Sequence, residues 1–167
     1  MTFKPNQDYW TNVYITEQFI SIRTYSGLGL AGADPLFPQH LLEPDADHHT
    51  LGLTVLQALQ NSRTLSNEEC ETTDFFDLTA GKLRYQAWYQ ELMQRYGYKT
   101  KKALFKNMQL CGIHCVNGII TIIPYRHEKL EAWGGDGIEE SDYVVLSTAS
   151  TPEEIGAGLR LAISRCR

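Results

Sequence analysis

Apolar positions are most regular between residues 107 and 124, which read NMQLCGIHCVNGIITIIP. Two runs rich in β-branched residues meet there at Asn117-Gly118. This dipeptide suits a type I′ turn, because both central residues of such a turn need a positive φ, so the pattern predicts a β-hairpin. The second arm, 119–123, is apolar on both faces apart from Thr121, and we expect a central strand covered by helices on both sides.

Further strands are predicted where apolar and polar residues alternate, near 12–25, 127–133 and 142–147. The stretch 26–49 is rich in glycine, proline and aspartate and has no sustained period. It is therefore expected to form a long irregular connection.

Three segments show the spacing of three and four residues that is typical of helices, at 50–62, 78–96 and 151–166. The last has the clearest start, because Thr151, Pro152 and Glu154 suit the N-cap, N1 and N3 positions of a capping box. The pattern predicts one α+β domain over residues 1–167. Its sheet is expected to be largely antiparallel or mixed, with the Asn-Gly hairpin at its centre and three or four helices around it.

The composition fits one domain with a substantial core, since the chain has 167 residues and is 43% hydrophobic. The net charge of −5 argues against direct nucleic-acid binding, which usually requires a basic surface. The sequence contains no export signal and no apolar run long enough for a membrane span. We therefore expect a cytoplasmic protein that does not contact a membrane.

The four cysteines show no CxxC spacing, so the sequence predicts neither a zinc site nor a redox pair. Cys111 and Cys115 share one face of a strand but would lie roughly 13 Å apart, too far for a disulfide. Buried free thiols are the expected state, and no cofactor or metal is expected.

Candidates for chemistry are few. A group of acids and histidines occurs at Glu43, Asp45, Asp47, His48 and His49, but its spacing matches no common metal motif. Gly27, Gly29 and Gly32 superficially resemble a dinucleotide-binding motif, yet no helix follows them. His114 and His127 flank the hairpin and leave open an acid-base hydrolase or nuclease, although a lone strand histidine is more often structural.

Three longer stretches, 51–63, 96–113 and 153–166, together with 120–133, resemble the immunity proteins of bacterial contact-dependent growth inhibition systems. The similarity covers most of the chain after about residue 50. It implies a small cytosolic protein without catalytic activity that binds and blocks the C-terminal domain of a delivered toxin. Toxins of such systems are commonly nucleases that cleave RNA or DNA, and no catalytic residue is implied. A regulatory adaptor that binds another cellular protein is the remaining alternative.

Acidic residues concentrate in loop-like stretches, two of which are candidate toxin-binding surfaces. The first candidate for the toxin-binding surface is a group of acidic residues around an aromatic side chain, at Glu68, Glu69, Glu71, Asp74, Phe76 and Asp77. The second choice is Asp136, Glu139, Glu140 and Asp142. Acids would steer a basic nuclease and the aromatic ring would supply a desolvated contact. The alternative is that these are solvated loops and that the aromatic pair Phe75-Phe76 packs under the following helix. The oligomeric state is left open.

Overall fold

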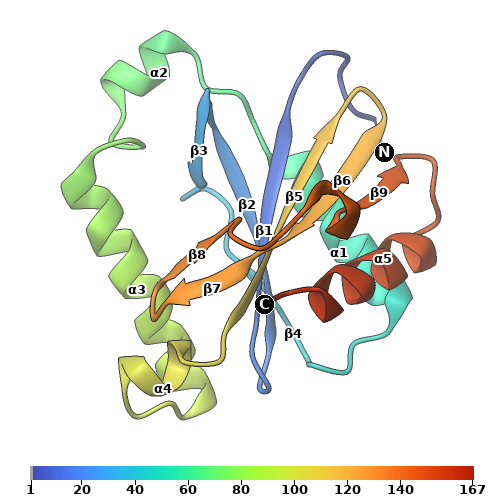
Figure 1. The fold of residues 1–167 in the computed structure, drawn as a ribbon. Helices are drawn as coiled ribbons and strands as arrows, with labels where there is room; N and C mark the ends of the chain where they lie inside the picture. The colour runs from blue at the N-terminus through green and yellow to red at the C-terminus, as the bar shows by residue number, and fades with distance from the viewer. Residues whose placement is uncertain (1) are drawn as a thin grey trace.

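An antiparallel sheet runs through the middle of the protein, with helices on both faces (Figure 1). The computed structural model describes residues 2–167. The strands lie in the order β3 (Leu30–Ala33), β2 (Ile20–Leu28), β1 (Tyr9–Ile15), β5 (Gln109–Val116), β6 (Ile119–Pro124) and β9 (Val144–Ser147), and β4 (His40–Leu42) also pairs with β2. Every pair is antiparallel, which confirms the predicted fold class.

The hairpin of β5 and β6 forms as its sequence predicts. Asn117 and Gly118 have φ values of 48° and 80°, and the last paired residues are Val116 and Ile119. The two turn residues therefore adopt the left-handed conformation that an Asn-Gly dipeptide tolerates at low cost.

One face of the sheet carries α1 (His48–Asn61) and α5 (Pro152–Ser164). The two helices approach so closely that a Cβ on Gly156 would lie 1.9 Å from the carbonyl oxygen of His48. A Cβ on Gly52 would lie 1.8 Å from the carbonyl oxygen of Pro152. Glycine at both positions is what lets the helices pack together over the buried side chains of β1, β2, β5 and β6.

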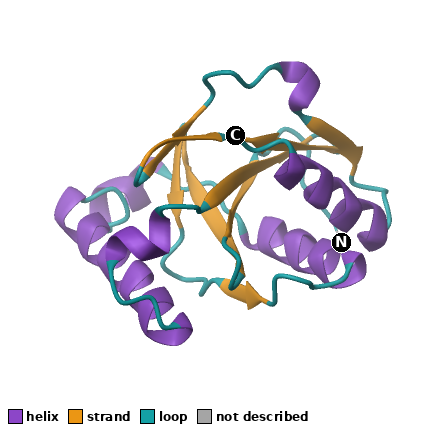
Figure 2. Cartoon of the chain, turned by 60° about the horizontal axis from the view of Figure 1, so that its bottom comes forward, coloured by secondary structure: helices purple, strands orange, loops and turns teal. Residues whose placement is uncertain are grey.

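The opposite face carries α3 (Leu78–Tyr96) and α4 (Lys101–Phe105), so the sheet lies between two helical layers (Figure 2). Trp88, Leu92 and Phe105 form the centre of this second core and pack with Tyr14 and Phe19. Helix α3 ends at Tyr96 because the next residue, Gly97, adopts the left-handed conformation of a C-cap.

Three expectations are wrong in detail. The stretch 26–49 contains β3 and β4, because Gly29, with φ of 78°, allows a tight turn between β2 and β3. The strand expected at 127–133 forms a separate two-stranded sheet of β7 (Arg126–Lys129) and β8 (Ala132–Gly134). Pro124 ends β6, and β9 pairs with the edge of β6 that faces away from β5, so neither edge of β6 is free to pair with β7.

The third correction concerns burial of β6. Ile120 and Ile122 are fully buried under α1 and α5, but Ile119 is 51% exposed. The neighbouring Val145 of β9 is 63% exposed on the same side. Helices α3 and α4 cover the part of this face near β1 and β2 and leave the part near β6 and β9 open (Figure 2). No helix within residues 2–167 is long and apolar enough to cross a membrane.

Candidate functional site

The first acidic stretch is more ordered than a solvated loop. It contains a short helix, α2 (Asn67–Thr72), which begins with a capping box between Ser66 and Glu69. Glu69 also forms an ion pair of 3.2 Å with Arg63. Asp77 caps α3 by accepting a hydrogen bond of 2.7 Å from the backbone N–H of Ala80. These carboxylates hold local structure, whereas Glu68 and Glu71 are exposed.

The aromatic pair divides between core and surface. Phe75 is 8% exposed and Phe76 is 39% exposed, and the two rings pack edge to face with centroids 4.8 Å apart. Asp74 forms an ion pair of 3.3 Å with Arg84 of α3. Phe75 therefore anchors the stretch, while Phe76 remains available to a partner.

The second acidic stretch lies at the other edge of the sheet (Figure 1). It includes a single turn of 3-10 helix, η1 (Glu140–Asp142), immediately before β9. Asp142 accepts a hydrogen bond of 2.9 Å from the backbone N–H of Glu139 and pairs with Arg167 at 3.7 Å. Asp136, Glu139 and Glu140 are exposed. The two stretches are not brought together, so they are separate candidate surfaces.

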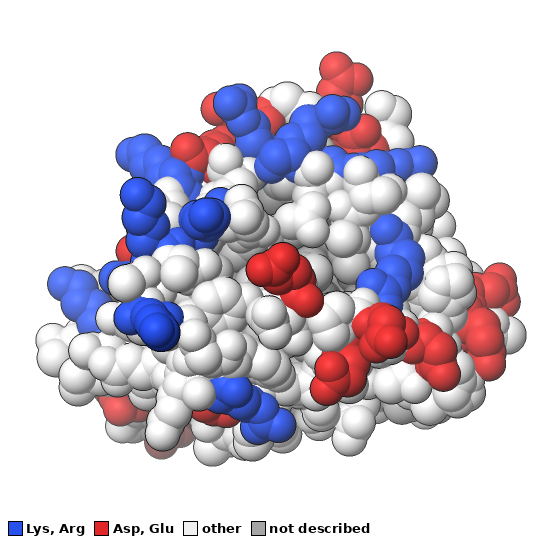
Figure 3. Space-filling model, turned by 90° about the horizontal axis from the view of Figure 1, so that it is seen from below, with Lys and Arg blue, Asp and Glu red and all other residues white. Residues whose placement is uncertain are grey.

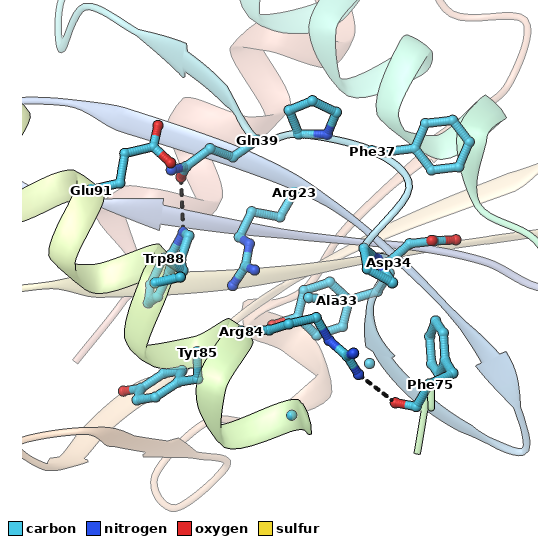
Figure 4. A pocket seen from close by; sticks show the side chains of 16 residues that line it. Arg23, Ala33, Asp34, Phe37, Gln39, Phe75, Arg84, Tyr85, Trp88 and Glu91 are labelled. Carbon is cyan, nitrogen blue, oxygen red and sulfur yellow. Dashed lines mark hydrogen bonds between the residues drawn. The ribbon is translucent and has the colours of Figure 1, made fainter. Parts of the chain in front are cut away.

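A hollow of about 490 Å³ lies between α3 and the edge of the sheet formed by β2 and β3 (Figure 4). Its walls combine the aromatic rings of Tyr25, Trp88 and Phe75 with the polar side chains of Arg23 and Gln39. Since Phe75 belongs to the first acidic stretch, this hollow and that stretch are continuous. We call the hollow the α3 cleft.

Arg23 extends from β2 into the α3 cleft (Figure 4). Its guanidinium lies over the Trp88 ring, 4.5 Å from the ring centroid. Within residues 2–167 this guanidinium forms no ion pair with a carboxylate, although six other positions of the chain do pair with one. Stacking orients an arginine without neutralising its charge, so Arg23 presents a free cation to the cleft.

Gln39 adds a second unpaired donor. Its Oε1 accepts hydrogen bonds from Ser21 Oγ, at 2.5 Å, and from Trp88 Nε1, at 2.8 Å. These two donors orient the amide so that Nε2 is left buried without an acceptor in the described part of the chain. A buried donor without an acceptor is costly, and it would be satisfied by a carbonyl or carboxylate that enters the cleft.

The wall formed by residues 34–39 is fixed by an ion pair at its start. Arg63 Nε donates a hydrogen bond of 2.7 Å to Asp34 Oδ2, and the Asp34 side chain is fully buried. Burial raises the pKa of Asp34, but the hydrogen bonds from Arg63 and other donors outweigh this effect and lower the pKa below its ordinary value. Asp34 is therefore ionised at neutral pH and holds the cleft wall against Arg63.

The histidines on which the hydrolase or nuclease alternative rests, His114 and His127, have separate contacts. His114 Nε2 lies 2.6 Å from Asp8 Oδ1, and the imidazole stacks on Trp10. His127 stacks on Trp133, and its Nε2 lies 2.8 Å from the carbonyl oxygen of Leu130. His114 pairs with Thr121 while His127 follows the end of β6, so strand spacing alone separates them by roughly 10 Å or more.

The remaining motifs have structural explanations. Asp47 is the N-cap of α1, and His49 pairs with Glu153 of α5 at 2.7 Å. Among the residues described, no three histidine, cysteine or acidic side chains form a group that could hold a metal ion. The glycines at 27, 29 and 32 lie on β2, β3 and the turn between them, so no helix N-terminus is available there for a phosphate.

Charge is unevenly distributed over the surface. On the face shown in Figure 3, Asp and Glu gather at the lower right, whereas Lys and Arg are spread over the left and the top, where further acidic residues also lie. The net charge alone therefore does not identify which face meets a basic partner.

Sequence reasoning did not find the α3 cleft. Its lining comes from β2, from the residues between β3 and β4, from the connection between α2 and α3, and from α3 itself. These segments are distant in sequence. The aromatic residues of the segment 78–96 are a partial signal in the sequence, because Trp88 contributes both to the core and to the cleft.

Comparisons with known proteins are consistent with one another. The family model described as CDI immunity protein, CdiI, matches residues 9–166. Immunity protein CdiI-YPIII of Yersinia pseudotuberculosis serotype O:3 (strain YPIII) is 46% identical over 168 residues, covering 95% of each chain. A solved structure of a protein of unknown function from Neisseria meningitidis is 49% identical, with a TM-score of 0.93 and complete coverage of both chains. A chain of the CdiA-CT/CdiI toxin and immunity complex from Yersinia pseudotuberculosis is 43% identical, with a TM-score of 0.89, covering 98% of this chain and 100% of that one.

Proposed function

This chain belongs to the CDI immunity protein family, CdiI, and we propose that it neutralises its cognate toxin by holding a segment of the toxin's C-terminal domain in the α3 cleft. The resemblance read from the sequence is confirmed, and the protein is an immunity protein of contact-dependent growth inhibition. Its partner is the C-terminal domain of the cognate toxin.

The observation that carries the proposed surface is the free cation of Arg23 in the α3 cleft. A guanidinium held over Trp88 and lacking a carboxylate offers planar donors to an incoming acceptor. Gln39, whose buried Nε2 has no acceptor in the described part of the chain, lines the same hollow. The cleft therefore suits a toxin segment that carries a carboxylate or exposed carbonyl oxygens and an apolar side chain for the aromatic walls.

The first acidic stretch forms the rim of this surface, because Phe75 lines the α3 cleft and Phe76 packs on it. We assign fast association with the toxin to the exposed acidic residues of the rim, and slow dissociation to the contacts in the cleft. Exposed charges mainly change the rate of association, whereas buried aromatic and arginine contacts mainly slow dissociation. The second acidic stretch lies at the opposite sheet edge and is the alternative surface.

A nuclease is the class of toxin that fits an immunity protein with an acidic rim. A domain that cleaves RNA or DNA needs a basic substrate face, to which the acidic rim is complementary. Inhibition then requires binding in the cytoplasm without turnover, and no residue of the cleft is assigned a catalytic role.

The test compares two arginines on the same side of the sheet. Arg23→Glu places a negative charge in the cleft, whereas Arg95→Glu changes an exposed residue near the end of α3. The probe is the purified C-terminal domain of the toxin encoded beside the gene for this chain. We expect Arg23→Glu to weaken binding by about 30-fold or more, because it leaves desolvated like charges at the contact. Arg95→Glu should bind as the wild type does. Equal affinity of all three proteins, with circular dichroism showing that each is folded, would place the toxin elsewhere.

A further inference from the structure

Two cysteines that are distant in sequence are in contact. Cys111 lies on β5 and Cys166 follows the end of α5, and their Sγ atoms are 3.5 Å apart. Both are free thiols. A disulfide requires a sulfur separation of about 2.05 Å, so the two sulfur atoms would have to approach each other by about 1.5 Å to bond.

The two positions differ in mobility and access. Cys111 is fully buried on a central strand, among the side chains that α1 and α5 cover. Cys166 is half-buried, two residues past the end of α5 and next to the last residue of the chain. Cys166 is therefore the side chain that small solutes reach first, and Cys111 is the fixed partner behind it.

The contact also makes the two thiols chemically unequal. The hydrogen bond from Cys111 lowers the pKa of Cys166, and the same bond together with burial raises the pKa of Cys111. A lower pKa increases the thiolate fraction, which is the form that reacts with oxidants. By contrast, burial raises the pKa of Cys115 to about 11, so that thiol stays protonated.

We propose that Cys111 and Cys166 form a site of reversible oxidative modification, at which hydrogen peroxide joins the two sulfurs in a disulfide. The Cys166 thiolate attacks one peroxide oxygen, the O–O bond breaks, and the departing hydroxide takes up a proton to become water. Cys166 is then a sulfenic acid. The Cys111 sulfur attacks the Cys166 sulfur, the S–O bond breaks, and the departing hydroxide leaves as a second water with the Cys111 proton. Two thiols lose two electrons in total, and one peroxide is reduced to two waters.

The disulfide would fix the C-terminal end to the centre of the sheet. In the reduced protein this end is held by backbone hydrogen bonds: Arg167 N–H donates to the carbonyl oxygen of Tyr125 at 3.1 Å, and His127 N–H donates to that of Arg167 at 2.7 Å. The crosslink would close a loop that contains β6 to β9 and α5. Restricting the unfolded chain in this way should raise the thermal unfolding midpoint by roughly 5 °C or more.

The test oxidises the full chain with hydrogen peroxide, using Cys70→Ser as the starting protein because Cys70 is half-exposed on α2 and could link two molecules. Intact mass should fall by two hydrogen atoms, and a reducing agent should restore it. After digestion with trypsin under non-reducing conditions, the peptide 107–126 should remain linked to the dipeptide 166–167 through the disulfide. The unfolding midpoint should rise on oxidation and return on reduction.

Two further serine variants identify the sulfurs. Cys115→Ser removes the other buried cysteine of the same peptide and should leave the crosslink intact. Because the Cys166 side chain is only half-buried, the variant Cys166→Ser should fold. It should lose both the crosslink and the shift in the unfolding midpoint. Loss of two hydrogen atoms from Cys166→Ser on peroxide treatment, or full titration of the thiols of the starting protein after that treatment, would overturn the proposal. A crosslink that disappears in Cys115→Ser would equally exclude Cys111.

Discussion

Asp34 Oδ2 accepts a hydrogen bond of 2.7 Å from Arg63 Nε, which ties the residues before β4 to the end of α1. Arg63 Nη2 donates to Oδ1 of the same carboxylate at 3.2 Å, so the contact is bidentate. Because the carboxylate is fully buried and the guanidinium is only partly exposed, loss of either partner leaves the other poorly solvated.

The first prediction concerns the pH dependence of stability. The pKa of Asp34 is lowered in the folded protein, so its contribution is present above the unfolded pKa of about 3.9 and is lost as the pH falls through the folded value. Asp34→Asn should lower the free energy of unfolding at pH 7 by about 2 kcal/mol, because Arg63 loses the buried, bidentate carboxylate and keeps only its ion pair with Glu69. Urea unfolding at pH 7 and at pH 3 should show the difference between wild type and variant shrinking at the lower pH. A difference that stays constant would mean that the ion pair does not contribute through its charge.

The second prediction concerns the contact between α1 and α5. Gly156→Ala places a Cβ against the backbone of His48, which has little room to move, and should lower the free energy of unfolding by about 3 kcal/mol. Gly81→Ala is the matched control, because Gly81 lies within α3 with no atom within 4 Å of its added Cβ. This control should raise stability by about 0.5 to 1 kcal/mol, since alanine favours helix more than glycine does. Thermal unfolding of both variants checks the prediction, and equal effects would contradict it.

The third prediction separates the two acidic stretches. Glu68→Lys with Glu71→Lys reverses exposed charges on α2 and leaves the capping residue Glu69 in place. Toxin association should slow by about tenfold at low salt and lose much of its salt dependence. Glu139→Lys with Glu140→Lys is the corresponding change at the other sheet edge and should leave association unchanged. Stopped-flow binding measures both, and the reverse pattern would move the surface to the second stretch.

The fourth prediction concerns the exposed ring of the rim. Phe76→Ala should mainly speed dissociation of the toxin, because it removes apolar contact area while leaving the charges in place. The protein should keep its stability within about 0.5 kcal/mol, since Phe76 is 39% exposed. Surface plasmon resonance separates the two rates, and an unchanged dissociation rate would exclude this ring from the interface.

The fifth prediction addresses the hydrolase alternative. Replacing both His114 and His127 with alanine should leave protection against the toxin intact, because each imidazole is engaged in its own local contact. Protection is measured as survival of cells that produce the toxin domain together with each variant. Loss of protection in a double variant that still folds would favour catalysis over binding.

Features that depend on a few neighbouring residues could be predicted from the sequence. Asn117-Gly118 defined the hairpin because its turn needs two left-handed residues. Thr151 and Glu154 defined the start of α5 because a capping box joins two residues that lie three positions apart. The fold class followed from these elements, and the family followed from the stretches that resemble it. The same local rules failed at 127–133, where pairing depends on which strand already lies beside β6.

Contacts between distant segments could not be predicted in this way. The stacking of Arg23 on Trp88 depends on where α3 lies over β2, and periodicity within either element does not specify that position. Cys111 and Cys166 were both expected to be buried free thiols, but their contact spans 55 residues and follows from the packing of α5 against β5. Side-chain patterns indicate which face of an element is buried, whereas the partner it meets there is set by how all the elements pack at once.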